Sequence, residues 1–357
     1  MVKAPLTTKP RGHPLAAYSK TESYLLEYFI EGIGPNCSQS RNHNPYITHI
    51  VPLSFCHSPL RNALLAVAGN QLRLLRDTRF VKQALMYKGQ ALSVMATVLM
   101  LCFHATFHHA PSACGSDPLR KFVEMYFVAH ETMSRTGSQS PISEGGKCTW
   151  SDVNDLDEID PVMGCSRRLM SLIDDISHLP LNIMDTSNPN NCHRNPNDID
   201  MAAKVAEIHS SLKDLTQNTT ITSREGKKLA NIAETKRVAA LVYLIERVNL
   251  TPINSQFKFA TSAKKNRMIA TIIRLKSNLP DTPILLWPLY IIGHARLVDD
   301  HQRRFILDRL QLMQRTRNLG SVRRTRTAVK RAFQVFDIKY SLDHTWGDNG
   351  IVPISLA

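Results

Sequence analysis

Apolar residues recur every three or four positions along most of this chain, which is the period of an amphipathic helix. The pattern predicts helices over residues 21–33, 58–75, 78–103, 117–135, 165–179, 200–216, 226–250, 262–277, 283–317 and 322–336. We find no run of useful length in which apolar and polar residues alternate as in a half-buried strand. We therefore expect an all-α protein, an irregular multi-helix domain.

The same period predicts which side of each helix is buried. The apolar stripe is expected at Leu60, Leu64, Val67 and Leu72 in the second helix, at Leu169, Leu172, Ile173 and Ile176 in residues 165–179, and at Val322, Val329, Phe333 and Phe336 in the last.

Two stretches lose this period and are rich in Ser, Gly, Asp, Asn and Pro. They predict long flexible loops at about 136–161 and 183–199. We expect one main domain over 21–340, with a flexible N-terminal tail at 1–20 and a C-terminal tail at 341–357.

The segment LLWPLY, within 283–317, places Pro288 inside the most apolar part of the chain. A proline in a helix interior removes one hydrogen bond, so we expect a kink at this point. A catalytic pocket, a membrane segment and a packed scaffold are the three interpretations to separate. The longest apolar stretch, 91–103, is shorter than the ~20 residues that span a bilayer, which argues against a membrane segment.

Charge and cysteine content narrow the class of protein. The 357 residues contain 44 Lys and Arg against 30 Asp and Glu, a net charge of +14 that favours anionic partners. The beginning of the sequence shows no apolar stretch typical of a secretion signal. The seven cysteines include no Cys-x-x-Cys pair, which indicates reduced thiols and an intracellular location.

Two groups of residues could carry chemistry. The acid pairs Asp174–Asp175 and Asp299–Asp300 resemble those that hold magnesium in all-α synthases, but the next helical turn supplies no third carboxylate. We therefore interpret them as solvated or N-terminal helix acids. A zinc site could use Cys102, His104, His108, His109 and Cys114, but this spacing matches no common zinc module, so a polar helix end is the favoured interpretation.

A basic run is the sharpest surface feature. Only Asp308 opposes the ten cations Arg303, Arg304, Arg309, Arg315, Arg317, Arg323, Arg324, Arg326, Lys330 and Arg331. They could contact phosphates, but no aromatic residues alternate with the outward cations, and a solvated or partner-facing surface is favoured. The segment RRTRTAVKR could also direct nuclear import.

Six segments follow one another along the chain: LLEYFIEGIGP, SPLRNALLAVAGNQL, RFVKQALMYKGQAL, DPVMGCSRRLMSLIDDISHL, ETKRVAALVYLIERV and the long segment from ILLWPLY to VKRAF. Together they resemble the regulatory domain of fungal zinc binuclear cluster transcription factors, in the second type of fungal-specific transcription factor domain. The resemblance spans roughly residues 21–340. It implies that the Trp-Pro pair is scaffold, with Trp287 filling core volume.

The resemblance implies a nuclear regulator of RNA polymerase II transcription that is not an enzyme and acts through protein or effector contacts. The alternative is a small-molecule sensor or enzyme-like pocket on the same scaffold. The family's six-cysteine zinc cluster has no counterpart among these cysteine spacings, so we expect no cofactor here and assign no catalytic, cofactor-binding, metal or DNA-binding residue. Expected partners are the transcription machinery, other regulators or a second copy, with DNA reached only through a separate module and no membrane.

Overall fold

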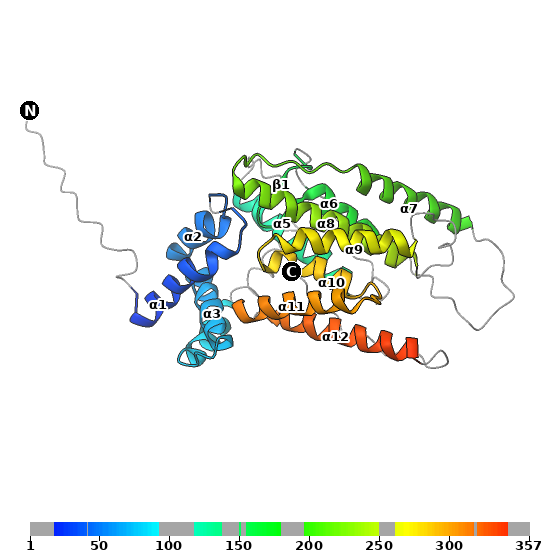
Figure 1. The fold of residues 1–357 in the computed structure, drawn as a ribbon. Helices are drawn as coiled ribbons and strands as arrows, with labels where there is room; N and C mark the ends of the chain where they lie inside the picture. The colour runs from blue at the N-terminus through cyan, green and yellow to red at the C-terminus, as the bar shows by residue number, and fades with distance from the viewer. Residues whose placement is uncertain are drawn as a thin grey trace, which may run out of the picture. The chain divides into compact units, whose positions relative to one another are not determined.

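The computed structural model describes residues 18–40, 42–92, 118–137, 150, 155–179, 196–249, 261–317 and 320–341. The chain divides into two compact units, Met1–Gly115 and Ser116–Ala357 (Figure 1). Helices make up almost all of the described secondary structure, and the only sheet among these residues has two strands of two residues each. The prediction of an all-α protein is confirmed.

The first unit is built from short helices. They are α1 (Lys20–Tyr28), the π-helical turn η2 (Phe29–Ile33), η3 (Gly34–Asn36), η4 (Tyr46–Ile50), α2 (Val51–Cys56), α3 (Ser58–Leu74) and the helical residues 81–92. Ser19 begins α1, because its hydroxyl accepts a hydrogen bond from the N–H of Glu22 and the Glu22 carboxylate accepts one from the N–H of Ser19. The helix therefore starts inside the predicted tail, at Lys20.

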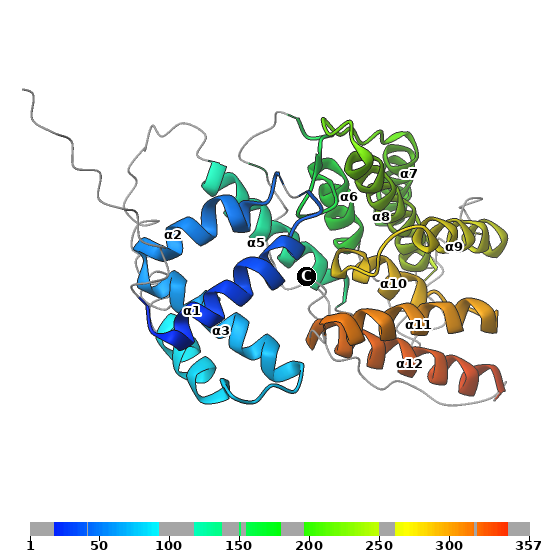
Figure 2. The same ribbon diagram turned by 60° about the vertical axis from the view of Figure 1, so that its left-hand side comes forward.

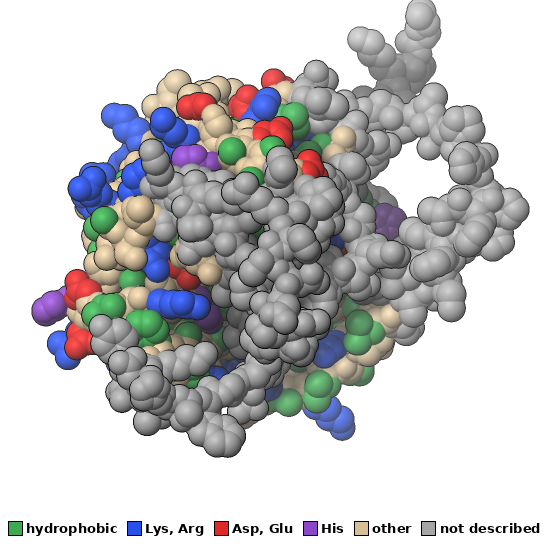
Figure 3. Space-filling view, turned by 90° about the vertical axis from the view of Figure 1, so that its right-hand side faces the viewer, with side chains coloured by type: hydrophobic (Ala, Val, Ile, Leu, Met, Phe, Trp, Pro, Cys, Tyr) green, Lys and Arg blue, Asp and Glu red, His purple; other side chains and the backbone are tan. Residues whose placement is uncertain are grey.

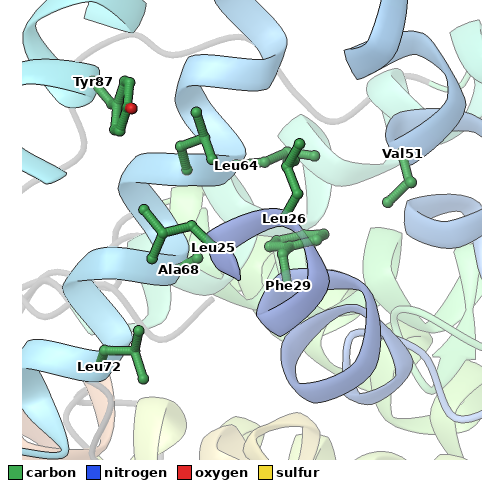
Figure 4. Packing of buried hydrophobic residues seen from close by; sticks show 9 residues of the cluster. Leu25, Leu26, Phe29, Val51, Leu64, Ala68, Leu72 and Tyr87 are labelled. Atoms are coloured by element: carbon green, nitrogen blue, oxygen red, sulfur yellow. The ribbon is translucent and has the colours of Figure 1, made fainter. Parts of the chain in front are cut away.

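The core of this unit lies between α1 and α3. Leu25 and Leu26 are fully buried and face Leu64 and Ala68 of α3 (Figure 4). Val67, predicted to be buried, is 48% exposed. The buried side of α3 runs through Leu64, Leu65, Ala68 and Leu72, so the helix is turned by about one residue from the predicted stripe.

The second unit contains the longer helices and a short β-hairpin. Its elements are α5 (Pro118–Thr136), β1 (Ile159–Asp160), β2 (Cys165–Ser166), α6 (Arg167–Ser177), α7 (Pro196–Asp214), α8 (Arg224–Val248), α9 (Ser262–Ser277), η6 (Pro283–Leu285), α10 (Leu286–Gly293), α11 (Asp300–Arg317) and α12 (Gly320–Ser341). β1 and β2 pair antiparallel, with Ile159 opposite Ser166.

Helix α8 is the centre of this unit. Most of its residues from Leu229 to Val248 are buried, because α6, α7, α9 and α10 pack around it (Figure 2). Helix α10 lies between α8 and the α11–α12 hairpin, and every residue of α10 is buried. Gly293 lets α10 approach α12, since a Cβ atom there would lie 2.6 Å from Cγ2 of Val329.

The predicted kink at Pro288 is wrong. Residues 283–317 form the 3₁₀ turn η6, then α10, then a break at 294–299, then α11, so Pro288 is the third residue of a short helix. A helix has no internal partner for the N–H groups of its first turn, so a proline there removes no helical hydrogen bond. The break comes instead at Arg296, whose φ of 53° lies in the left-handed region.

The predicted loops differ from the structure at their ends. Thr136 belongs to α5, and Ile159–Asp160 form β1, so the first loop was drawn too long on both sides. Helix α7 begins at Pro196, inside the second predicted loop. The middle of each loop lies outside the described residues, and the single domain over 21–340 stays a prediction.

Candidate interaction surface

Arg303 fastens α11 to α12 from the inside. Its guanidinium donates a hydrogen bond to the carbonyl of Leu297 at 2.8 Å and forms an ion pair with Asp337 of α12 at 2.7 Å. It also lies over the rings of Phe333 and Phe336, 5.2 and 5.5 Å from their centroids. Charge, hydrogen bonding and cation–π contact therefore all hold this arginine within the scaffold.

A buried ion-pair chain links α9 to α11. The ammonium of Lys276, whose side chain is 1% exposed, forms an ion pair with Asp281 at 2.6 Å, and Arg309 contacts the same carboxylate at 3.3 Å. Burial lowers the pKa of Lys276, and the Asp281 carboxylate opposes that shift. Such a pair is costly to break, because one partner would be left charged in a dry environment.

Arg326 of α12 faces α11. It donates hydrogen bonds to the side-chain oxygens of Gln311 at 2.9 Å and Gln314 at 3.3 Å. Together with Arg303 and Arg309, it accounts for three of the ten cations in the predicted basic run. These three are parts of the scaffold rather than of a binding surface.

Four other cations of α12 point the opposite way. Arg323, Arg324, Lys330 and Arg331 are exposed and form no ion pair with any described residue. We call these four residues the basic face. They lie on the solvent side of α12 around Thr327, each three or four residues from it, while Val322, Val329 and Phe333 fill the buried side as predicted.

The remaining cations of the run belong to α11. Arg304 and Arg315 are exposed, and Arg317 is the last residue of the helix. The exposed Asp308 lies between them in sequence, so α11 presents a mixed charge, whereas α12 presents cations alone from Gly320 to Phe336.

Trp287 is fully enclosed, as predicted for core. Its indole N–H donates a hydrogen bond to the Thr136 hydroxyl at 2.9 Å, and that hydroxyl donates to the carbonyl of Met133 at 2.7 Å. The ring packs edge-on against Tyr243, whose hydroxyl lies 3.3 Å from that of Ser177. The polar atoms around the Trp-Pro pair thus satisfy one another, which is the arrangement of a scaffold.

A tight turn between the strands is locked from two sides. The Asp160 carboxylate accepts hydrogen bonds from two backbone N–H groups of the turn, at 2.7 and 2.8 Å. The ammonium of buried Lys236 donates to the carbonyl of Met163. Gly164 has φ +65°, and a Cβ atom there would lie 2.5 Å from Ile284, so glycine is required on both counts.

Burial lowers the pKa of Lys236 and raises that of the neighbouring Cys165 thiol. Sequence reasoning did not single out Lys236 or Asp160. Lys236 stands in the polar stretch 234–237 of α8 and gives no sequence signal, and Asp160 is marked only by the Asp-Pro at the turn.

The order of these elements agrees with a comparison against known protein families. Residues 24–114 and 96–332 match the family described as the fungal specific transcription factor domain. The chain belongs to this family. No curated protein and no solved structure matched the chain in the other two comparisons.

Membership of the fungal specific transcription factor domain family indicates a regulator of transcription rather than an enzyme. Within the part of the chain that the structure describes, no helix combines the length and the apolar character needed to cross a bilayer.

The acid pairs have structural roles, and one prediction about them was wrong. Asp174 is not solvated: its side chain is 2% exposed and forms an ion pair with Arg135 of α5 at 2.7 Å. Asp175 beside it is half-buried. Asp299 caps α11, because its carboxylate accepts a hydrogen bond from a first-turn N–H at 2.8 Å, and Asp300 is exposed in that turn as predicted.

The zinc candidate falls outside the described residues. This applies to all five of its members, Cys102, His104, His108, His109 and Cys114. Among residues that are described, no three His, Cys, Asp or Glu side chains are placed to share a metal ion. The described cysteines, Cys37, Cys56 and Cys165, form no disulfide with one another.

Proposed function

We propose that this chain regulates transcription by RNA polymerase II in the nucleus, and that it does so through protein contacts made by the basic face of α12. Family membership supports the role in transcription. The proposed mode of action rests on one contrast between the cations of this region. Arg303, Arg309 and Arg326 make contacts within the scaffold, whereas the four cations of the basic face are exposed.

A protein partner fits this face better than the edges of DNA bases. The seven-residue step from Arg323 to Lys330 covers about 10.5 Å at the 1.5 Å rise of an α-helix, so the face reaches few phosphates. The exposed residues between the cations, Thr327 among them, include no aromatic side chain on which a base could stack.

The interior supports a scaffold more than a small-molecule sensor. Trp287 and Tyr243, the large aromatic side chains at its centre, are buried and pair with Thr136 and Ser177. The polar atoms of these two aromatic side chains are therefore already engaged.

A tethered reporter tests the proposal. The chain is fused to a DNA-binding module that carries its own nuclear import signal, and reporter transcript is compared with that of the module alone. We expect transcript to change at least about threefold, in either direction. A fluorescent fusion of the chain without the added signal is expected to accumulate in the nucleus. A folded chain that leaves transcript unchanged at several promoters would remove the proposed role.

A further inference from the structure

A row of acidic residues lies on the outer side of α7. Asp200, Glu207 and Asp214 are exposed, and none forms an ion pair with a described residue. Their spacing of seven residues places them on one line, about 10.5 Å apart. The Ser210 hydroxyl donates a hydrogen bond to Asp214 at 3.2 Å, and half-buried Lys204 borders the row. We call these three acids the acidic row.

The basic face of α12 has the same period. Arg323 and Lys330 form one line of cations, and Arg324 and Arg331 form a second, each with a step of seven residues. The two lines are about 100° apart around the helix, on either side of Thr327. Two neighbouring acids of a row with a seven-residue step can therefore lie between them, each close to one pair of cations.

The two surfaces cannot neutralise each other within one chain. In both views α7 and α12 lie on opposite sides of the second unit, with α8 and α10 between them (Figures 1 and 2). Figure 3 shows Asp and Glu side chains, with Lys and Arg among them, along the upper part of the described surface, the side that α7 occupies in Figure 1. Each surface is thus available to another molecule.

We propose that the basic face of α12 binds the acidic row on α7 of a second copy of this chain. We choose a second copy as the partner because two exposed helices of the same protein carry opposite charges at the same spacing. The inference rests on the proposed function in that it names the partner of the same face.

This contact joins two different surfaces, so association is head-to-tail and can continue from copy to copy. Exposed ion pairs contribute about 0–1 kcal/mol each and are screened by salt, so association is weak and sensitive to ionic strength. The fraction of associated chains would increase where several copies are held close together, for example at neighbouring sites on DNA.

Sedimentation of the full chain, from about 10 to 500 µM and at about 50 and 500 mM salt, tests this. Four proteins are compared with the parent chain. Variant one carries Arg323→Glu, Arg324→Glu, Lys330→Glu and Arg331→Glu. Variant two carries Asp200→Lys, Glu207→Lys and Asp214→Lys. Variant three combines both sets. The control carries Lys227→Glu, Lys228→Glu, Arg267→Glu and Arg274→Glu, four exposed cations on α8 and α9.

We expect the parent chain and the control to associate at low salt and to dissociate at high salt. Variants one and two each lose at least about tenfold in association constant, equal to about 1.4 kcal/mol. A mixture of the two, and variant three alone, associate again because the charges are exchanged but still complementary.

Three results would overturn the proposal: no self-association of the parent chain, equal loss in the control, or no recovery in the mixture. If the parent chain shows no self-association but binds duplex DNA, and variant one does not bind it, the basic face is assigned to nucleic acid instead. The reporter measurement is independent of sedimentation, so a failed self-association with an active reporter would leave the proposed function standing.

Discussion

The two sides of the α11–α12 hairpin use the same residue types in opposite ways. On the inner side, Arg303 and Arg326 are held by ion pairs, side-chain amides and aromatic rings. On the outer side, the four cations of the basic face meet solvent. The difference teaches that the composition of this basic segment says little by itself, because the helix period decides which cations fasten the fold and which remain for a partner.

Among substitutions inside the fold, the largest loss of stability is expected at Trp287 of α10. Replacing it with alanine removes a buried ring and the hydrogen bond to Thr136, and should cost about 3 to 5 kcal/mol of unfolding free energy. Urea denaturation followed by far-UV circular dichroism measures this without relying on tryptophan fluorescence. Trp287→Phe keeps most of the ring and should lose about 1 to 2 kcal/mol. An alanine variant that unfolds at the parent midpoint would show that this region is not core.

Breaking the buried ion pair on α9 is expected to have the next largest effect. Lys276→Met leaves Asp281 with Arg309 alone and should cost about 3 kcal/mol. The control is Arg274→Met on the same helix, which is exposed and should change stability by about 0.5 kcal/mol or less. Adding Asp281→Asn to Lys276→Met should recover part of the loss, and strict additivity of the two substitutions would refute a coupled pair.

Buried and exposed histidines are expected to differ in how they make stability depend on pH. Burial lowers the pKa of His294 below its ordinary 6.5, although the hydrogen bond with the Tyr290 carbonyl opposes the shift. A lowered folded-state pKa gives stability that is fully present above pH 6.5 and is lost as the pH falls toward the folded-state pKa. Denaturation at pH 7 and pH 5 should show this loss.

The loss should shrink in His294→Gln and persist in His301→Gln, since His301 is exposed at the start of α11. His130 and His209, whose pKa values burial also lowers, leave a residual slope in the same direction. Equal slopes in the two variants would contradict a role for His294.

Pro288→Ala is expected to have the smallest effect of the substitutions inside the fold. The proline is in the first turn of α10, so alanine restores no helical hydrogen bond that the native helix lacks and removes only part of a buried ring. A loss of about 1 kcal/mol or less is expected from chemical denaturation. A loss of stability as large as that of Trp287→Ala would mean that Pro288 determines the backbone conformation of this segment.

Periodicity predicted the inner side of the hairpin well and the ends of helices poorly. Val322, Val329 and Phe333 are buried as predicted and Phe336 is half-buried, because one apolar stripe suffices to orient a long helix. LLWPLY was misjudged because the apolar run continues through a 3₁₀ turn and a helix start without changing composition. Only the position of the backbone hydrogen bonds distinguishes those from a kink.

Contacts between distant residues account for the rest of what the sequence could not show. Thr136 was placed in a loop because Ser, Gly and Asp follow it, yet its hydroxyl meets Trp287, 151 residues later. Asp174 was expected in solvent, although Arg135 holds it in the interior. Local patterns carry no information on such pairs. The acidic row on α7 was not singled out from the sequence, because its exposure and its place on the side of the unit away from α12 required the fold.

The most direct test of the division between inner and outer cations compares reporter output per folded protein for two charge-reversed chains. One carries glutamate at Arg323, Arg324, Lys330 and Arg331, and the other carries it at Lys227, Lys228, Arg267 and Arg274; both are tethered through the module with its own import signal. We predict that both unfold within about 1 kcal/mol of the parent chain, and that only the first loses reporter output. Full output from the first chain, or equal losses in both, would contradict the account.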